Sequence, residues 1–259
     1  MPLKKKSIRR PRKKNMLRKK PALAKMVKQI LNRNEETKIV STTLAYTGFN
    51  SSITATGDAL TILPAVVQGV SQAGRVGSAI TPIKLVIRGY VVYRADAYQP
   101  AVMLGGRLFC WSDKTVSNYS VSTSAGQLFN LLDAGGTSQT FDGTVTRYEL
   151  PHNTDQFRFY ADKKFRVCKP FGYTNTLGTS NTSAMTTIDR SMYHPFTITI
   201  PASKMPKQLK YDSTLSANYP TNFAPYLSIG YCDLMTYGPD VTPTQLGMSF
   251  TSTLYYKDA

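Results

Sequence analysis

The chain has 259 residues, of which 32 are Lys or Arg and 15 are Asp or Glu, giving a formal net charge of +17. Hydrophobic residues make up 41% of the sequence, which is enough to bury a core and excludes a chain that is disordered throughout. The excess of positive charge favours a polyanionic partner, with nucleic acid ahead of an anionic membrane surface.

The positive charge is concentrated at the N-terminus, where the first acid is Glu35. The other 18 cations are balanced by 15 acids, so the rest of the chain has a net charge of only +3. The 14 cations before Glu35 are predicted to contact nucleic acid: Lys4, Lys5, Lys6, Arg9, Arg10, Arg12, Lys13, Lys14, Arg18, Lys19, Lys20, Lys25, Lys28 and Arg33.

Residues 1–21 are predicted to form a disordered basic arm. Like charges repel, and the segment has too few apolar groups to offset the entropy lost on ordering. Phosphates would neutralise the arm through counterion release, without reading base sequence. A solvated tail or a nuclear-import signal are the alternative interpretations, and import is compatible with binding.

Residues 22–36 are predicted to form a short amphipathic helix. Pro21 suits its first turn, and Lys25, Lys28 and Arg33 lie off its apolar side. Because such a helix is marginal alone in water, its stripe must pack against the body or against a neighbouring copy. The stripe follows the i, i+3, i+4 spacing of a helix and consists of Leu23, Met26, Val27, Ile30 and Leu31.

Residues 37–259 are predicted to form an all-β body, with no helix after Glu36. Runs rich in Val, Ile, Thr, Tyr and Phe alternate in polarity and are separated by turn residues. Such strands must bury their apolar faces in a sandwich, and an eight-stranded antiparallel jelly roll is the best match. The predicted strands are 38–45, 83–93, 104–111, 141–149, 157–160, 165–167, 196–200, 208–211, 227–231 and 248–256.

Two details of this body are specific. In residues 83–88, Lys84 and Arg88 are predicted to lie on the face opposite Ile83, Leu85 and Ile87. Asp162 and Lys163 are predicted to form the turn of a hairpin, although that pair lacks the preferred glycine. The long connections 112–127, 170–193, 212–225 and 236–245 are predicted to carry function or to meet a partner, with solvated loops that have no role as the alternative.

The sequence shows no pattern typical of catalysis or of cofactor binding. His152 and His194 lack metal-ligand spacing, and the phosphate-binding and nucleophile motifs are missing. Three distant cysteines indicate buried apolar residues rather than disulfides. We therefore predict no enzyme activity, cofactor or metal site, while calcium between subunits and a carbohydrate-binding or hydrolytic sandwich stay open. No membrane-spanning or secretory segment is predicted.

The order of these features resembles the coat proteins of small circular single-stranded DNA viruses that encode a rolling-circle replication initiator. It is also similar to the coat protein of the tobacco necrosis satellite virus, which contains RNA. The resemblance covers most of the chain, and it depends on the order of several weak motifs. The segments that carry it are 26–38, 68–77 leading into 83–93, 107–113, 157–167, 206–211 and 227–259.

The resemblance implies a jelly-roll shell domain over residues 37–259, assembled as sixty copies with the arms inside. Sixty such arms would carry about 840 charges, which matches a genome segment on the order of a thousand nucleotides. It also implies a single-stranded genome, DNA in preference to RNA, an unknown host receptor, and a virion location with assembly in the host nucleus. A non-capsid nucleic-acid-binding β protein with a basic tail is the alternative.

Overall fold

The computed structural model describes residues 36–53, 58–69, 71, 73–94, 103–118, 130–168, 192–212, 218–235 and 245–258. All of them belong to the body of the protein. The arm of residues 1–21 and nearly all of the helix predicted for residues 22–36 lie outside the described residues, so those two predictions stay predictions.

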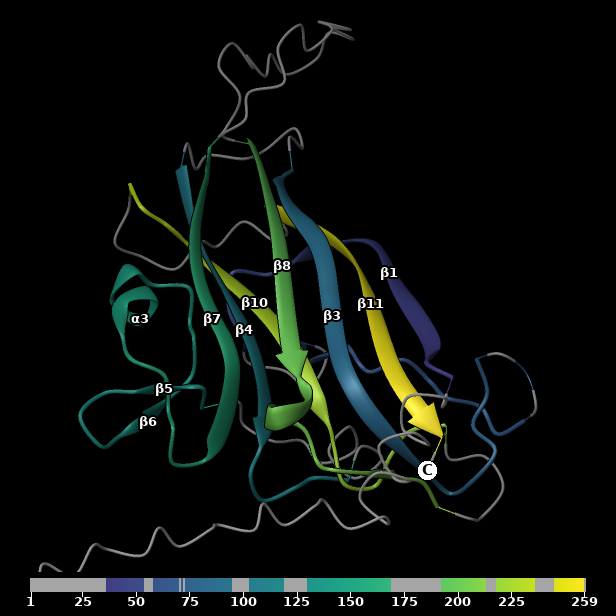
Figure 1. The fold of residues 1–259 in the computed structure, drawn as a ribbon. Helices are drawn as coiled ribbons and strands as arrows, with labels where there is room; N and C mark the ends of the chain where they lie inside the picture. Colours follow the sequence, from purple (N-terminus) through teal and green to yellow (C-terminus); the bar gives the residue numbers. More distant parts are fainter. Residues whose placement is uncertain are drawn as a thin grey trace, which may run out of the picture. The chain divides into compact units, whose positions relative to one another are not determined.

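The first sheet contains four long antiparallel strands in the order β1-β11-β3-β8 (Figure 1). Their β-branched and aromatic residues alternate with small polar ones, a pattern that fits a sheet buried on one face only. The short strand β9 (Leu209–Lys210) extends the pairing of β3. The four bounds are β1 Lys38–Phe49, β3 Ala79–Tyr93, β8 Tyr193–Pro201 and β11 Leu246–Asp258.

The second sheet has the order β2-β10-β4-β7 and is also antiparallel. Every residue of β10 is buried, and so is every residue of β4 except the first. Both faces of these two central strands are therefore covered, whereas the edge strand β7 keeps exposed residues. The bounds are β2 Leu60–Thr61, β4 Met103–Asp113, β7 Phe157–Cys168 and β10 Pro225–Asp233.

The pairing of these eight strands is nested. In chain order, the first strand pairs with the eighth, the second with the seventh, the third with the sixth and the fourth with the fifth. Rolling one long antiparallel hairpin into two facing sheets produces this pattern, which is the topology of a jelly roll. The predicted eight-stranded antiparallel jelly-roll sandwich is confirmed.

The main core lies between the two sheets. Leu85 and Ile87 of β3 and Leu254 of β11 meet Leu108 of β4 and Leu227 of β10, and all five are buried. Each such side chain contributes about 1.5–3 kcal/mol on burial. A slip of one residue would turn these side chains outward, so the core fixes the register of the strands.

The remaining described elements are short. A hairpin of β5 (Leu132–Asp133) and β6 (Ser138–Gln139) and the helix α3 (Val145–Glu149) lie in the connection between β4 and β7. A 3-10 turn, η3 (Ala202–Lys204), follows β8. In the β5–β6 hairpin, Asp133 Oδ1 accepts a hydrogen bond from Gly136 N at 2.7 Å.

The predicted hairpin at Asp162 and Lys163 is wrong, because β7 runs through both residues without a turn. The pair lacks the glycine that a two-residue hairpin favours. The carboxylate of Asp162 is instead satisfied within the sheet by Arg107 of β4. A register shift opposite Cys110 and Trp111 leaves one extra residue in β7, which is a β-bulge rather than a reversal of the chain.

The predicted strand 141–149 is also wrong, and so is the prediction of no helix after Glu36. Only Phe141 makes a β-bridge, to Ile53, and α3 begins four residues later. Asp142 Oδ1 accepts a hydrogen bond from Thr144 N at 3.0 Å, and the hydroxyl of Thr144 caps α3 by accepting from Arg147 N at 3.3 Å. These local bonds favour a turn and a helix start over a strand.

Candidate functional site

The residues predicted from sequence to bind nucleic acid, from Lys4 to Arg33, lie outside the described residues, as does the apolar stripe from Leu23 to Leu31. The structure neither brings them together nor separates them. The candidate surfaces described next therefore belong to the body and were mostly not predicted from the sequence.

The outer face of the second sheet is covered by the chain itself. We call residues 130–156 the cover; this segment is the longer of the two described parts of the connection between β4 and β7, and it contains β5, β6 and α3 (Figure 1). A second buried cluster joins Phe109 and Trp111 of β4 to Leu132 and Phe141 of the cover. A Cβ at Gly230 of β10 would lie 2.5 Å from the ring of Phe141, so the cover packs directly on backbone.

Arg107 fastens the cover to the sheet. Its side chain is 2% exposed, and it binds Asp162 of β7 in a bidentate pair, Nε to Oδ1 at 2.9 Å and Nη2 to Oδ2 at 2.6 Å. Its Nη1 donates to the carbonyl oxygens of Tyr148 at 3.0 Å and Leu150 at 2.6 Å, at the C-terminal end of α3. One guanidinium therefore satisfies a carboxylate and two helix-end carbonyls that would otherwise be buried without partners.

His152 completes this network on its exposed side. Its Nδ1 lies 3.2 Å from Asp162 Oδ2, and its ring packs on Phe159 with centroids 4.5 Å apart. Glu149 of α3 pairs with Lys164 of β7 at 2.7 Å nearby. All these contacts hold the cover in place, and the described residues place no hydroxyl or thiol in hydrogen-bond contact with His152.

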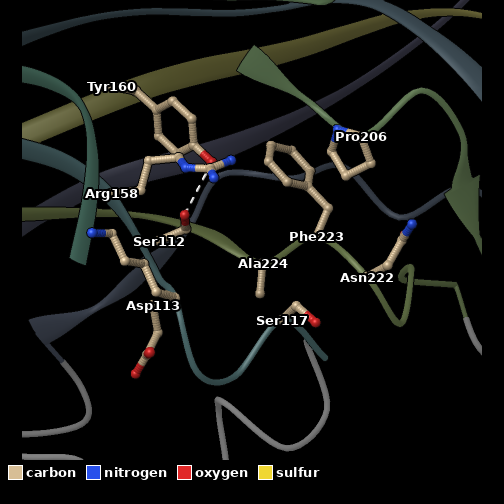
Figure 2. A pocket seen from close by; sticks show the side chains of 10 residues that line it. Ser112, Asp113, Ser117, Arg158, Tyr160, Pro206, Asn222, Phe223 and Ala224 are labelled. Atoms are coloured by element: carbon tan, nitrogen blue, oxygen red, sulfur yellow. Dashed lines mark hydrogen bonds between the residues drawn. The ribbon is translucent and has the colours of Figure 1, made fainter. Parts of the chain in front are cut away.

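A pocket of about 170 Å³ lies where β4 ends and β7 begins (Figure 2). Ser112 and Tyr160 share a hydrogen bond of 3.0 Å on its wall, with Arg158 beside them. Burial raises the pKa of Tyr160, so its phenol stays protonated near neutral pH. Asn222 and Phe223 line the other side.

The acid at this pocket is used locally. Asp113 Oδ1 accepts from Thr115 N and from Thr115 Oγ1, both at 2.6 Å, which caps the turn after β4. Its carboxylate points away from the rings of Tyr160 and Phe223 (Figure 2). The pocket therefore presents a guanidinium, hydroxyls and an amide to its surroundings, an arrangement suited to an anion or to a polar loop.

The cysteines and acids of the described residues do not gather into a metal site. Burial raises the pKa of the Cys110 thiol, and it raises that of Cys232 to about 12, so neither is a thiolate at neutral pH. Cys168 is half-buried, and all three cysteines are free. Within the described ranges, no helix is long and apolar enough to cross a bilayer.

The outer face of the first sheet is open, in contrast to the covered one. We define the open face as the outward side chains of β1, β3, β8 and β11. Its rows, read across the strands, are Ile39, Tyr255, Lys84 and Pro201; Ser41, Thr253, Val86 and Thr199; Thr43, Thr251, Arg88 and Thr197; Ser249, Tyr90 and Pro195; and Val92 and Tyr193. Hydroxyl groups dominate this face, and Lys84 and Arg88 are its cations, as the alternation of residues 83–88 predicted.

The edge where the two sheets meet is also closed by side chains. Lys163 of β7 donates to the backbone oxygen of Thr197 of β8 at 2.8 Å. His194 of β8 stacks on Phe165 of β7, with centroids 4.8 Å apart and planes 11° apart. Lysine on an edge strand discourages pairing with other chains, so this edge is protected from aggregation.

No protein-family model matches the chain, and no curated protein matches its sequence. Among solved structures, the chain is similar to one from Desmodium yellow mottle tymovirus, with 11% sequence identity, coverage of 86% of each chain and a TM-score of 0.34. A similarity this low adds nothing to the strand pairing described above.

Sequence reasoning missed Arg107, Asp162 and the cover. The available signal was an arginine inside an otherwise apolar strand, because a charged residue there needs a buried partner. The partner could not be found from sequence, since Asp162 lies 55 residues away and was interpreted as part of a turn.

Proposed function

We propose that this chain is a viral coat protein whose jelly-roll bodies assemble into a closed shell around a genome held by the N-terminal arms. One observation carries the proposal: 14 cations without an acid precede Glu35, whereas the remainder of the chain has a net charge of only +3. Phosphate polymers bind such a cluster through counterion release. The proposed role is structural rather than enzymatic.

The nearly neutral body supports assembly. Copies of a body with a net charge of +3 can approach one another with little repulsion, while the arms repel until nucleic acid neutralises them. Assembly would then depend on the genome. The jelly roll alone does not select this function, since lectins and enzymes share it.

The finer parts of the proposal come from the resemblance to coat proteins of small circular single-stranded DNA viruses. They are a shell of sixty copies, a single-stranded genome with DNA favoured over RNA, a virion location and passage through the host nucleus. No cofactor is included in the proposal.

The test compares the full chain with a truncation that begins at Glu36. We expect the full chain to form closed particles in electron microscopy and to protect copurified nucleic acid from nuclease. The truncation should retain the folded body, measured by circular dichroism, and lose most of the nucleic acid. Treatment with DNase and RNase separately identifies the polymer retained.

Two outcomes would count against the proposal. If the full chain stays monomeric across salt and pH with nucleic acid present, the chain does not act as a shell protein. If it binds nucleic acid only as small discrete complexes, the alternative of a non-capsid nucleic-acid-binding protein with a basic tail is favoured, because that alternative also explains the arm.

A further inference from the structure

We propose that the open face, formed by β1, β11, β3 and β8, is a second nucleic-acid contact, a platform on which single-stranded nucleic acid lies along the direction of β3. The inference rests on the proposed function, since it assumes that the chain packages a polymer of nucleotides. It adds a binding surface in the folded body, separate from the arm.

The charge of the open face fits a polyanion. Strands β1, β3 and β8 contain no acid, and the one acid of β11, Asp258, pairs with Lys38 at 2.6 Å at the end of the strand. Lys84 and Arg88 project from the same face of β3. Among the described residues, neither cation has a carboxylate partner, so both remain available to phosphates.

The position of Lys84 is set by an aromatic ring. Its ammonium lies over the ring of Tyr255 of β11, 4.5 Å from the ring centroid. The attraction between the cation and the ring favours this position of the ammonium. Arg88 stands two rows away, between Thr251 and Thr197. The two cations therefore follow the direction of β3, and a strand of nucleic acid could contact both.

Aromatic rings supply the second requirement for single-strand binding. Tyr193 is 46% exposed and stacks with Tyr90, with centroids 5.3 Å apart and planes 26° apart. A ring supported from one side and exposed on another can accept a base, and every base has a π-face that can stack. Cations and exposed aromatic rings on one surface are the features of sequence-tolerant single-strand binders.

Hydroxyl groups occupy much of the remaining face. Ser41 pairs with Thr253 at 2.9 Å, and Thr43 pairs with Thr251 at 3.2 Å, so two rows of hydroxyls cross from β1 to β11. Hydroxyls can donate to phosphate oxygens and add no negative charge. A second copy of this chain fits the face less well, because the core of a protein interface is richer in large apolar side chains.

The open face is also continuous with the arm along the chain. Its edge strand β1 begins at Lys38, three residues after Glu35 ends the stretch of 14 cations. The chain therefore links the arm covalently to the strand at the edge of the open face. Linking two binding segments raises the effective concentration of a polymer at the second, weaker contact.

The first test measures binding of full-length protein to a labelled thymidine oligonucleotide at several salt concentrations. The double variant Lys84→Thr/Arg88→Thr should lower the slope of log affinity against log salt by about 1.4, since each single-strand phosphate contact contributes about 0.7. The matched control Lys204→Ser/Lys207→Ser removes the same charge near η3, off the open face, and should change the slope by less. An equal decrease of the slope in both variants would mean that only net charge determines binding, and this result would overturn the inference that the open face is a nucleic-acid contact.

The second test separates stacking from charge. Tyr193→Thr should weaken binding of the oligonucleotide about tenfold and leave binding of inorganic polyphosphate unchanged, because polyphosphate has no bases. In the unmodified protein, a 5-iodouracil oligonucleotide should cross-link to Tyr193 or Tyr90 on irradiation. Absence of that adduct, or tighter binding to anionic phosphatidylserine vesicles than to the oligonucleotide, would overturn the inference.

These results are distinguishable from failure of the proposed function. If particles form and retain nucleic acid but neither substitution changes binding, the open face is not a contact and the coat-protein proposal still stands. If no particles form while the open face binds the oligonucleotide, the coat-protein proposal fails and the nucleic-acid contact on the open face still stands. Unchanged thermal unfolding of each variant establishes that the body is intact.

Discussion

The outer faces of the two sheets differ although both sheets share one core. The second sheet places Phe109, Trp111 and Tyr226 in a cluster that the cover buries. The first sheet projects mainly hydroxyl-bearing side chains, together with Lys84 and Arg88, and among the described residues no comparable segment packs on it. The difference teaches that large outward side chains require additional chain to exclude water, whereas a hydroxyl-rich face stays free for a partner.

The largest effect is expected where the cover is fastened. Arg107→Met removes the guanidinium and leaves Asp162 and the carbonyls of Tyr148 and Leu150 without it. Breaking one side of a buried ion pair costs about 3–5 kcal/mol. We expect the free energy of unfolding to fall by that amount in urea denaturation, with faster proteolysis within residues 130–156.

The open face provides the matched comparison. Thr43→Val removes a hydroxyl pair with Thr251 on an exposed surface and keeps the β-branched shape, so its effect should stay within about 0.5 kcal/mol. If both substitutions destabilise the protein equally, the assignment of Arg107 as the fastening of the cover is wrong.

An intermediate effect is expected at the base of the covered face. Trp111 donates from Nε1 to Ser228 Oγ at 3.0 Å, and both residues are buried. Ser228→Ala leaves the indole N–H without this acceptor, at a cost of about 1–3 kcal/mol in thermal or urea unfolding. In a double-mutant cycle, adding Ser228→Ala to Trp111→Phe should cost far less than in the parent protein. Additive losses would contradict this explanation.

The smallest effect is expected at the edge between the two sheets. Burial, and secondarily the charge of Lys163, lowers the pKa of His194 below its ordinary value of 6.5. The folded state therefore resists protonation more than the unfolded state does. His194 leaves the free energy of unfolding unchanged at pH 8, and that free energy falls as the pH drops from about 6.5 through the lowered pKa. His194→Gln should reduce the decline in melting temperature over this window. An identical pH dependence in the variant would rule out His194 as its source.

Alternation of side chains predicted much of the fold. Alternation predicts strands at residues 83–93 and 248–256; β3 begins four residues earlier and ends at the same residue, and β11 is two residues longer at each end. The strand β2 is not predicted from the sequence, because it has only two residues and alternation can be recognised only in a longer run. Helix α3 was missed because residues 141–149 were predicted to be a strand, whereas Thr144 caps the helix and Asp142 holds Thr144 through short local hydrogen bonds.

The sequence by itself determined the class of the body, the faces of its longer strands and the separation of charge before Glu35, because periodicity and charge are local properties that a linear chain displays. Only the tertiary structure decided that Arg107 meets Asp162, that residues 130–156 cover one sheet, and that Lys84, Arg88 and Tyr193 share the open face of the other. Those contacts join residues far apart in the chain, and nested strand pairing, which no local pattern encodes, brings them together.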